Sequence, residues 1–195
     1  RIGRTPFVPA PDSGYAYADI PKVTTILGAA KLTGRTDDGL TLAALSALTD
    51  REEAVAEDVN GVRNPAFTVE PRGSYNALRI KKEIGEQSSI GLMATGAFKE
   101  ERYPALSGGV DWNLAVSGGD LLLEGYLAGS QVTFSPDLRW TGGAGRVGLA
   151  KPSGEHLLAF TTYDFSSNYF SVSNLGFYSQ PREQGGYTEI LYKED

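Results

Sequence analysis

The sequence predicts an all-β fold, an antiparallel up-and-down meander of about nine strands that forms an open curved sheet, part of a transmembrane β-barrel. Three observations predict it. Apolar and polar side chains alternate with a period of 2 rather than 3.6. Gly, Asp and Pro separate the alternating segments, and short and long connections alternate along the chain. A length of 195 residues suits one domain, so we expect residues 1–195 to form a single β-meander segment of this barrel.

The predicted strands are about ten residues long, which is the length of a tilted strand that crosses a hydrocarbon layer. The first two read "TILGAAKLTGRTDDGLTLAALSALT", two mildly apolar runs joined by Asp-Asp-Gly, which is typical of a β-hairpin. The nine segments span residues 25–36, 39–49, 75–84, 88–98, 109–117, 120–130, 142–151, 155–166 and 185–193.

The connections fall into two classes. Tight turns, with Gly, Asp or Pro at the bend, are predicted at residues 37–38, 85–87, 118–119 and 152–154. Longer polar loops are predicted at residues 50–74, 99–108, 131–141 and 167–184. Because alternate connections of a meander lie at the same end, we expect only tight turns at one end and only long loops at the other. Outer-membrane barrels have this asymmetry.

Every second residue of a strand points to the same face, and we call these two sets of positions the two parities of the strand. Charged side chains inside the predicted strands fall mostly on one parity, as expected where one face of a barrel wall lines a polar lumen. Lys82 breaks the rule near a turn, and the segment 39–49 is apolar on both parities. The predicted lumen-facing polar residues are Lys31, Arg35, Arg79, Lys81, Asp111 and Glu124. The residues expected on the opposite face are Leu32, Ile80, Trp112 and Leu123. Inward charges of this kind hold a plug, tune what passes, or only pair with one another.

Four aromatic residues are predicted near strand ends on the long-loop side: Phe98, Trp112, Trp140 and Phe165. Aromatic girdles of transmembrane barrels lie at such positions, at the membrane interface. Two alternatives stay open. Aromatic residues pack in the strands of any β-protein, and the two tryptophans could instead stack on sugar rings.

Several blocks of sequence occur in an order similar to that of a known family. They read "RIGR.P", "TTILGAAKLTGRT", "LSALTDRE", "VEPRGSYNALRIKKE", "GGVDWN", "GYLAGSQV", "SGEH" and "SNLGF". From about Arg1 to Phe177 the chain resembles bacterial proteins with a carbohydrate-binding-family-9-like N-terminal domain and a C-terminal region of unassigned function. The resemblance implies that this region is an outer-membrane β-barrel and that the chain is its first part. The family tends to carry acidic or amide residues where this chain has Ser171, Ser173 and Asn174, so the resemblance supports no polar site there.

Residues that carry common catalytic chemistry are scarce. The chain has no Cys, which excludes disulfides, Cys-ligated zinc and a thiol nucleophile. The single His156 follows Glu155 at a turn, and no Gly-x-Ser-x-Gly motif accompanies it. The acidic residues of segment 50–58 do not have the spacing of a calcium loop, and the net charge of −6 argues against nucleic-acid binding. We therefore expect no enzyme, no cofactor, no metal and no nucleic-acid partner.

The expected role is passage or binding of a solute in the bacterial outer membrane. Its expected partners are the lipid bilayer, a carbohydrate or other small solute, and the missing remainder of the same barrel. The alternative is a soluble or surface-exposed carbohydrate-binding β-domain. A barrel wall needs a continuous apolar band about 25 Å tall on one face, whereas a binding module needs a core buried between two sheets.

The number of predicted strands is odd, whereas bacterial single-chain barrels have an even number. We therefore expect the chain to be a piece of a longer protein and its sheet to be open. Its two edges would be the segments 25–36 and 185–193, each with unpaired backbone donors and acceptors that invite aggregation.

Overall fold

The computed structural model describes residues 15–58, 60–63, 65–172 and 182–194. Within these ranges the chain forms twelve strands, and the only helical element is the 3-10 turn η2 (Ser117–Gly119). No helix in the described residues is long and apolar enough to cross a membrane. The all-β prediction is confirmed.

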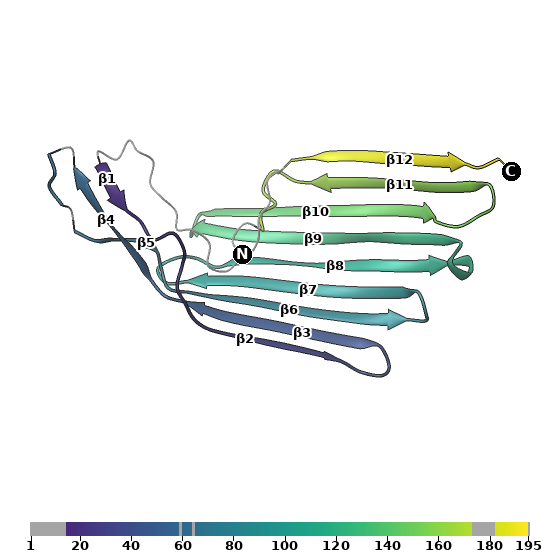
Figure 1. The fold of residues 1–195 in the computed structure, drawn as a ribbon, viewed down its shortest axis with the longest axis horizontal. Helices are drawn as coiled ribbons and strands as arrows, with labels where there is room; N and C mark the ends of the chain where they lie inside the picture. Colours follow the sequence, from purple (N-terminus) through teal and green to yellow (C-terminus); the bar gives the residue numbers. More distant parts are fainter. Residues whose placement is uncertain (1–14, 59, 64, 173–181, 195) are drawn as a thin grey trace.

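Nine strands form one antiparallel sheet in which almost every strand pairs with its neighbour in sequence (Figure 1). Each of them overlaps one predicted segment. They are β2 (Ile26–Arg35), β3 (Leu40–Thr49), β6 (Gly73–Ile84), β7 (Ser88–Lys99), β8 (Ala105–Val116), β9 (Leu121–Ser135), β10 (Leu138–Lys151), β11 (Leu157–Ser166) and β12 (Gln184–Tyr192).

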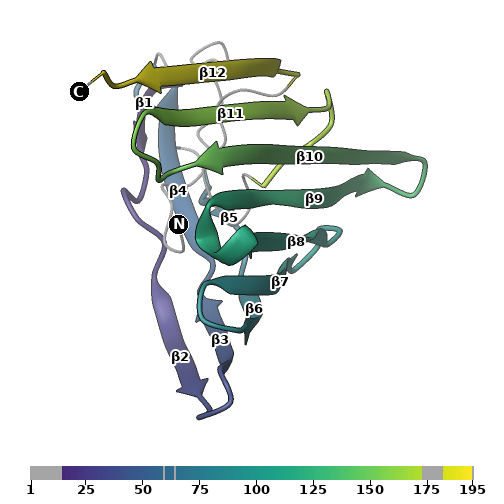
Figure 2. The same cartoon turned by 90° about the vertical axis from the view of Figure 1, so that its right-hand side faces the viewer.

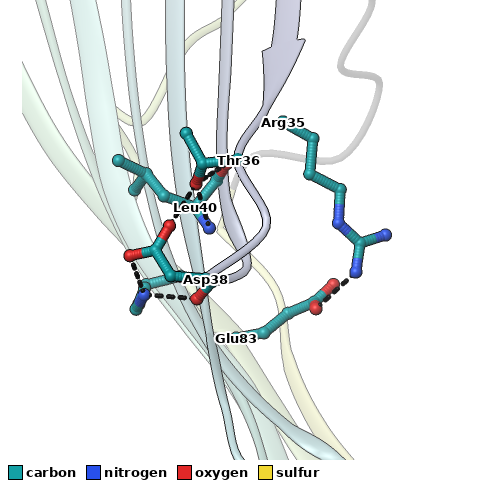
Figure 3. A network of polar contacts seen from close by, with 6 residues as sticks. Arg35, Thr36, Asp38, Leu40 and Glu83 are labelled. Atoms are coloured by element: carbon teal, nitrogen blue, oxygen red, sulfur yellow. Dashed lines mark hydrogen bonds and ion pairs between the residues drawn. The ribbon is translucent and has the colours of Figure 1, made fainter.

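The four predicted tight turns all lie at one end of this sheet, on the right in Figure 1. The turn between β2 and β3 bends at Gly39, whose φ of 80° favours glycine. Figure 3 shows the polar contacts that fix it. The Thr36 hydroxyl contacts the Asp38 carboxylate and the Leu40 backbone, while Arg35 binds Glu83 of β6 at 2.6 Å.

The opposite end is less uniform than the sequence analysis expected. The prediction of a long loop over residues 131–141 is wrong. Strand β9 ends at Ser135 and β10 begins at Leu138, so only Pro136 and Asp137 form the turn between them. These two residues are turn formers, and the β-branched and aromatic residues before them extend the strand. The loop 99–108 shrinks to residues 100–104, because β8 begins at Ala105.

The predicted loop 50–74 contains strands of its own. Strands β4 (Glu52–Asp58) and β5 (Phe67–Glu70) join β1 (Tyr15–Asp19) in a three-stranded antiparallel sheet with the order β1-β4-β5. This order repeats β2-β3-β6, since each strand of the small sheet continues one strand of the large sheet beyond a short break (Figure 1). The Lys99 amine on β7 binds the Glu70 carboxylate at 2.6 Å, and this largely buried ion pair ties the small sheet to the large one.

The large sheet is a single layer with two free edges. Its order runs from β12 to β2 without closing, so the prediction of an open sheet is confirmed, with β2 and β12 as its edges. Figure 2 shows how the strand direction turns strongly from β2 to β12. The buried side chains of these strands are Ala47, Thr49, Tyr75, Ala97, Ala105, Ser130, Val132, Ala144 and Thr162. The pairing register places all of them on one face.

Candidate functional site: the charged face of the sheet

The strand register determines which side chains share a face, because directly paired residues of antiparallel strands point to the same side. Arg35 pairs with Thr41, and Thr41 pairs with Lys81. Followed across the sheet, one row of paired residues reads Arg35, Thr41, Lys81, Gly91, Asp111, Tyr126, Arg146, Asp164 and Gly185. We call its five charged members and Tyr126 the charged belt: Arg35, Lys81, Asp111, Tyr126, Arg146 and Asp164.

The six polar residues predicted to face a lumen all lie on the face of the charged belt, which we call the charged face. Counting only side chains on this face, Arg79 lies one row and Lys31 two rows from the belt toward the long-loop end. Glu124 lies one row from the belt toward the tight turns. Leu32, Ile80, Trp112 and Leu123 lie on the opposite face, as expected. Burial and charge thus share one face of the sheet.

Arg79 of β6, one row from the belt, forms an ion pair with Asp111 of β8 at the centre of the belt. Both terminal guanidinium nitrogens of Arg79 contact the carboxylate, with Nη2 and Oδ1 2.8 Å apart. The pair passes directly over Gly91 of the intervening strand β7. A Cβ atom at Gly91 would lie 2.5 Å from Arg79 Nη2 and 2.6 Å from Asp111 Oδ2. The absence of a side chain at Gly91 therefore allows the two charges to meet across a strand.

Further charged contacts continue the belt on both sides. Arg35 binds Glu83 near the tight turns. Arg146 Nε lies 3.6 Å from Asp164 and donates a hydrogen bond to the Thr162 hydroxyl at 3.0 Å. In the described part of the chain, Lys31 and Glu124 form no ion pair. The belt mixes both signs of charge, which is typical of a wall that contacts polar solutes or ions.

The sequence analysis missed three belt residues: Tyr126, Arg146 and Asp164. Their parity carries the same signal as the six predicted residues, since each alternates with apolar neighbours such as Leu127, Val147 and Phe165. The alternation of polar and apolar residues is weak in these segments, because each has few charged residues and glycines lie close to Arg146.

Residues 167–172, which we call the inward segment, fold onto the charged face instead of projecting from the sheet. Ser167 and Gly143 exchange two hydrogen bonds, and the Ser171 N–H donates to the Ser130 hydroxyl at 2.8 Å. The backbone of Tyr169 and Phe170 rests on Gly142 so closely that a Cβ atom there would overlap it. Phe170 is buried, at 7% exposure.

A hollow lies between this segment and the belt. Its volume is about 330 Å³, and Val172 lines it from the side of the inward segment. Arg79, Asp111 and Tyr126 line it from the sheet, and Gly109 and Ala128 contribute small residues beside them. The charged face therefore has recesses that can hold small molecules.

The opposite face, which we call the apolar face, carries large apolar side chains from every strand of the sheet. Its exposed residues include Leu32, Leu42, Leu78, Ile90, Leu92, Leu106, Val110, Leu127, Val147, Leu149, Tyr163 and Ile190. Three basic residues also lie there: Lys82, Arg139 and Lys151. Each is at or near the end of its strand. The middle of the apolar face is free of charge across the nine strands.

The four predicted interface aromatics are placed differently from one another. Phe98 and Phe165 lie on the apolar face at the long-loop end, over Gly96 and Gly145. Trp112 lies on the same face over Gly125, but in the half of β8 nearer the tight turns. The expected position of Trp112 near the long loops is therefore wrong, because β8 begins four residues earlier than predicted.

Trp140 lies on the charged face, where it pairs with Val132. Its indole contacts the ring of Phe134 edge to face, with the centroids 4.8 Å apart, and the ring of Tyr169 at 5.6 Å. This aromatic group is at the long-loop end, beside the inward segment.

Other residues considered in the sequence analysis lie outside this arrangement. His156 contacts the Lys193 backbone at the turn end of the sheet. In the part of the chain that the structure describes, no group of three or more His, Asp or Glu side chains is placed to hold a metal ion. Of the three family-block residues, Ser173 and Asn174 lie outside the described residues, and Ser171 belongs to the inward segment.

Residues 1–194 match a family described as a domain of unknown function, DUF5916. No curated protein and no solved structure matches the chain.

Proposed function

The chain belongs to the DUF5916 family, and we propose that it forms part of the wall of a transmembrane β-barrel in the bacterial outer membrane. Its charged face would line a passage or binding site for a small polar solute, and its apolar face would contact lipid. The observation that carries this proposal is the separation of charge and large apolar side chains on the two faces of a single-layer sheet.

The size of the apolar face supports the proposal. Arg139 and Lys151 lie twelve residues apart on β10, which corresponds to about 40 Å along a strand. A strand tilt of 35–45° reduces this to about 30 Å across a bilayer, close to the apolar band of about 25 Å in such barrels. Basic side chains at both borders can extend toward the lipid headgroups, where they are tolerated.

The soluble binding-module alternative has less support. In such a module the large apolar residues lie between two packed layers. Here Leu32 is 73% exposed and Ile190 67%, and no second layer of described residues covers the apolar face. A contiguous apolar surface of this size marks an interaction with lipid or another protein.

The free edges support a second part of the proposal, that further strands complete the barrel. Exposed backbone groups on β2 and β12 would be unsatisfied in hydrocarbon, which is why only closed barrels span membranes as sheets. We attribute the missing strands to the same protein, as the family resemblance implies. A preceding carbohydrate-binding-family-9-like domain and a carbohydrate-related solute also rest on that resemblance.

The absence of cysteine permits a direct test. Single cysteines would replace Leu92 and Met93 on β7, and Tyr126 and Leu127 on β9, in the full-length protein in native membranes. A membrane-impermeant charged maleimide is expected to label Met93→Cys and Tyr126→Cys. Leu92→Cys and Leu127→Cys should react only after the membranes are dissolved in detergent.

Each pair compares neighbouring residues of one strand that point to opposite faces. Local unfolding would label both members of a pair and would remove the alternation. Equal labelling at all four positions, or recovery of the protein without membranes, would exclude the barrel wall.

A further inference from the structure

A second recess lies at the long-loop end of the charged face. It has a volume of about 480 Å³, within the range of small-molecule pockets. Buried Ala97, Ala105 and Val132 form its floor. Three partly exposed aromatic rings surround it: Tyr103 from the β7–β8 connection, Phe134 from β9 and Trp140 from β10.

The aromatic rings are held in place although they are exposed. Trp140 is 41% exposed, yet Phe134 contacts one side of its indole and Tyr169 another. Tyr169 is fixed in turn, because the neighbouring Phe170 is buried and the backbone of both residues rests on Gly142. Fixed aromatic rings lose little conformational entropy on binding a ligand.

The polar side chains of the recess come from the end of β7, the β7–β8 connection and the inward segment: Lys99, Glu101, Arg102 and Ser171. Lys99 already binds Glu70, and Glu101 lies 3.8 Å from Arg51 but is 81% exposed, so its carboxylate can still accept hydrogen bonds. Arg102 forms no ion pair or side-chain hydrogen bond within the described part of the chain, so its guanidinium is available to a ligand. The recess therefore offers aromatic faces, a free cationic donor and a carboxylate acceptor within one small volume.

We propose that this recess binds a sugar ring. One face of a pyranose ring presents C–H groups, whose partial positive charge suits the negative face of an aromatic ring. The rim of the sugar carries hydroxyls, which can donate to Glu101 and accept from Arg102. Arg102 and Lys99 disfavour a cationic ligand in this aromatic recess, so a neutral or acidic sugar fits best. The inference gives the carbohydrate-related solute of the proposed function a specific binding site, and its argument does not depend on membrane insertion.

The test uses the fluorescence of Trp140 in the full chain folded in detergent. The chain has only two tryptophans, so Trp112→Phe leaves Trp140 as the sole indole. The probes are cellobiose, maltose, chitobiose and digalacturonate, with choline as a cationic probe. At least one sugar is expected to change the Trp140 fluorescence with a saturable dependence on concentration, and choline is expected to have no effect.

Three variants locate the site. Phe134→Ala should weaken binding of the active sugar about tenfold or more, whereas Phe98→Ala on the apolar face should leave it unchanged. Arg102→Ala should weaken digalacturonate more than a neutral sugar. Far-UV circular dichroism checks that each variant keeps its β-structure.

Three results would overturn the proposal. One is a folded protein that responds to none of the four sugars. Another is a response to choline alone. The third is a loss of affinity in Phe98→Ala equal to that in Phe134→Ala. None of these results bears on the cysteine-labelling test, so the two proposals fail separately.

Discussion

At the scale of single residues, two adjacent glycines of β10 have different structural roles. Gly142 lies on the charged face under the backbone of Tyr169 and Phe170, which leaves no room for a Cβ atom. Gly143 lies on the other face, where a Cβ atom would meet its nearest neighbour at an ordinary 3.6 Å. The position of the inward segment therefore depends on the absence of a Cβ atom at Gly142.

We expect Gly142→Ala to displace the inward segment and Gly143→Ala to leave it in place. The displaced segment would expose the ring of Phe170 and separate Tyr169 from Trp140. Limited proteolysis near residues 167–172 and Trp140 fluorescence in a Trp112→Phe background measure the change. Equal cleavage of both variants would contradict this account of Gly142.

A second residue-scale prediction concerns Asp38 in the turn between β2 and β3. Hydrogen bonds from Lys82 and Thr36 lower the pKa of Asp38 from its ordinary 3.8 to about 2. A carboxyl group with a lowered folded pKa stabilises the fold above its unfolded pKa, and this contribution is lost as the pH falls. The turn should therefore lose stability between about pH 4 and pH 2.

Asp38→Asn should remove this part of the acid dependence, because the amide does not titrate. Unfolding midpoints at about pH 5 and about pH 2 measure the effect in the full chain. Asp37→Asn, one residue earlier and without a bond to Lys82, is the matched control. The same loss of acid dependence in both variants would show that Asp38 has no special role.

At the scale of elements, the attachment of the small sheet depends on the ion pair between Glu70 of β5 and Lys99 of β7. Both side chains are largely buried, at 11% and 16% exposure. Removing one partner of a buried pair leaves the other charge without compensation, which costs about 3 kcal/mol or more. The ring of Tyr75, 5.8 Å from the Lys99 amine, offsets part of this cost.

Glu70→Gln is therefore expected to lower the free energy of unfolding by about 2 kcal/mol. Asp50→Asn breaks the pair with Arg72, in which both side chains are more than a third exposed, and should cost less than about 1 kcal/mol. Denaturant unfolding of both variants in detergent provides the comparison. A cost for Glu70→Gln no larger than that for Asp50→Asn would show that the small sheet is attached by other contacts.

The elements also show how far the sequence predicts the structure. Most strands of the large sheet follow from the period of 2, because their apolar residues alternate with polar ones. Strand β3 is apolar on both parities, and the Asp-Asp-Gly turn before it predicts the strand instead. Strand β4 reads "EEAVAED", and its small alanines and many acidic residues resemble a solvated loop. Strand β4 pairs with β1 and β5 because these three strands continue β3, β2 and β6, which already pair in the large sheet. The local sequence does not reveal this pairing.

The candidate site was predictable in part for the same reason. Side-chain direction follows from parity alone, so Arg79 and Asp111 could be assigned to one face. Their meeting across Gly91 requires the register of three strands, which no local pattern fixes. The inward path of residues 167–172 and the place of Trp140 on the charged face likewise depend on tertiary contacts between β9, β10 and β11.

At the scale of the whole molecule, the free edges decide whether the chain is a complete unit. Seven strands separate β2 from β12, so at about 4.8 Å per strand the edges lie almost 40 Å apart along the sheet. A closed barrel of these nine strands would bring the edges to hydrogen-bonding distance. The structure has no ladder between the two edge strands.

Disulfide trapping in this cysteine-free chain distinguishes the open sheet from the closed one. Thr161 of β11 and Thr188 of β12 are directly paired, and their hydroxyls lie 2.8 Å apart. The double variant Thr161→Cys with Thr188→Cys is therefore expected to cross-link under mild oxidation in detergent. Ala30→Cys of β2 with Thr188→Cys should stay reduced within a single chain, because disulfide formation requires Cα atoms within about 7 Å. An intramolecular cross-link between Ala30→Cys and Thr188→Cys would mean that nine strands suffice to close the barrel, and the further strands proposed here would be unnecessary.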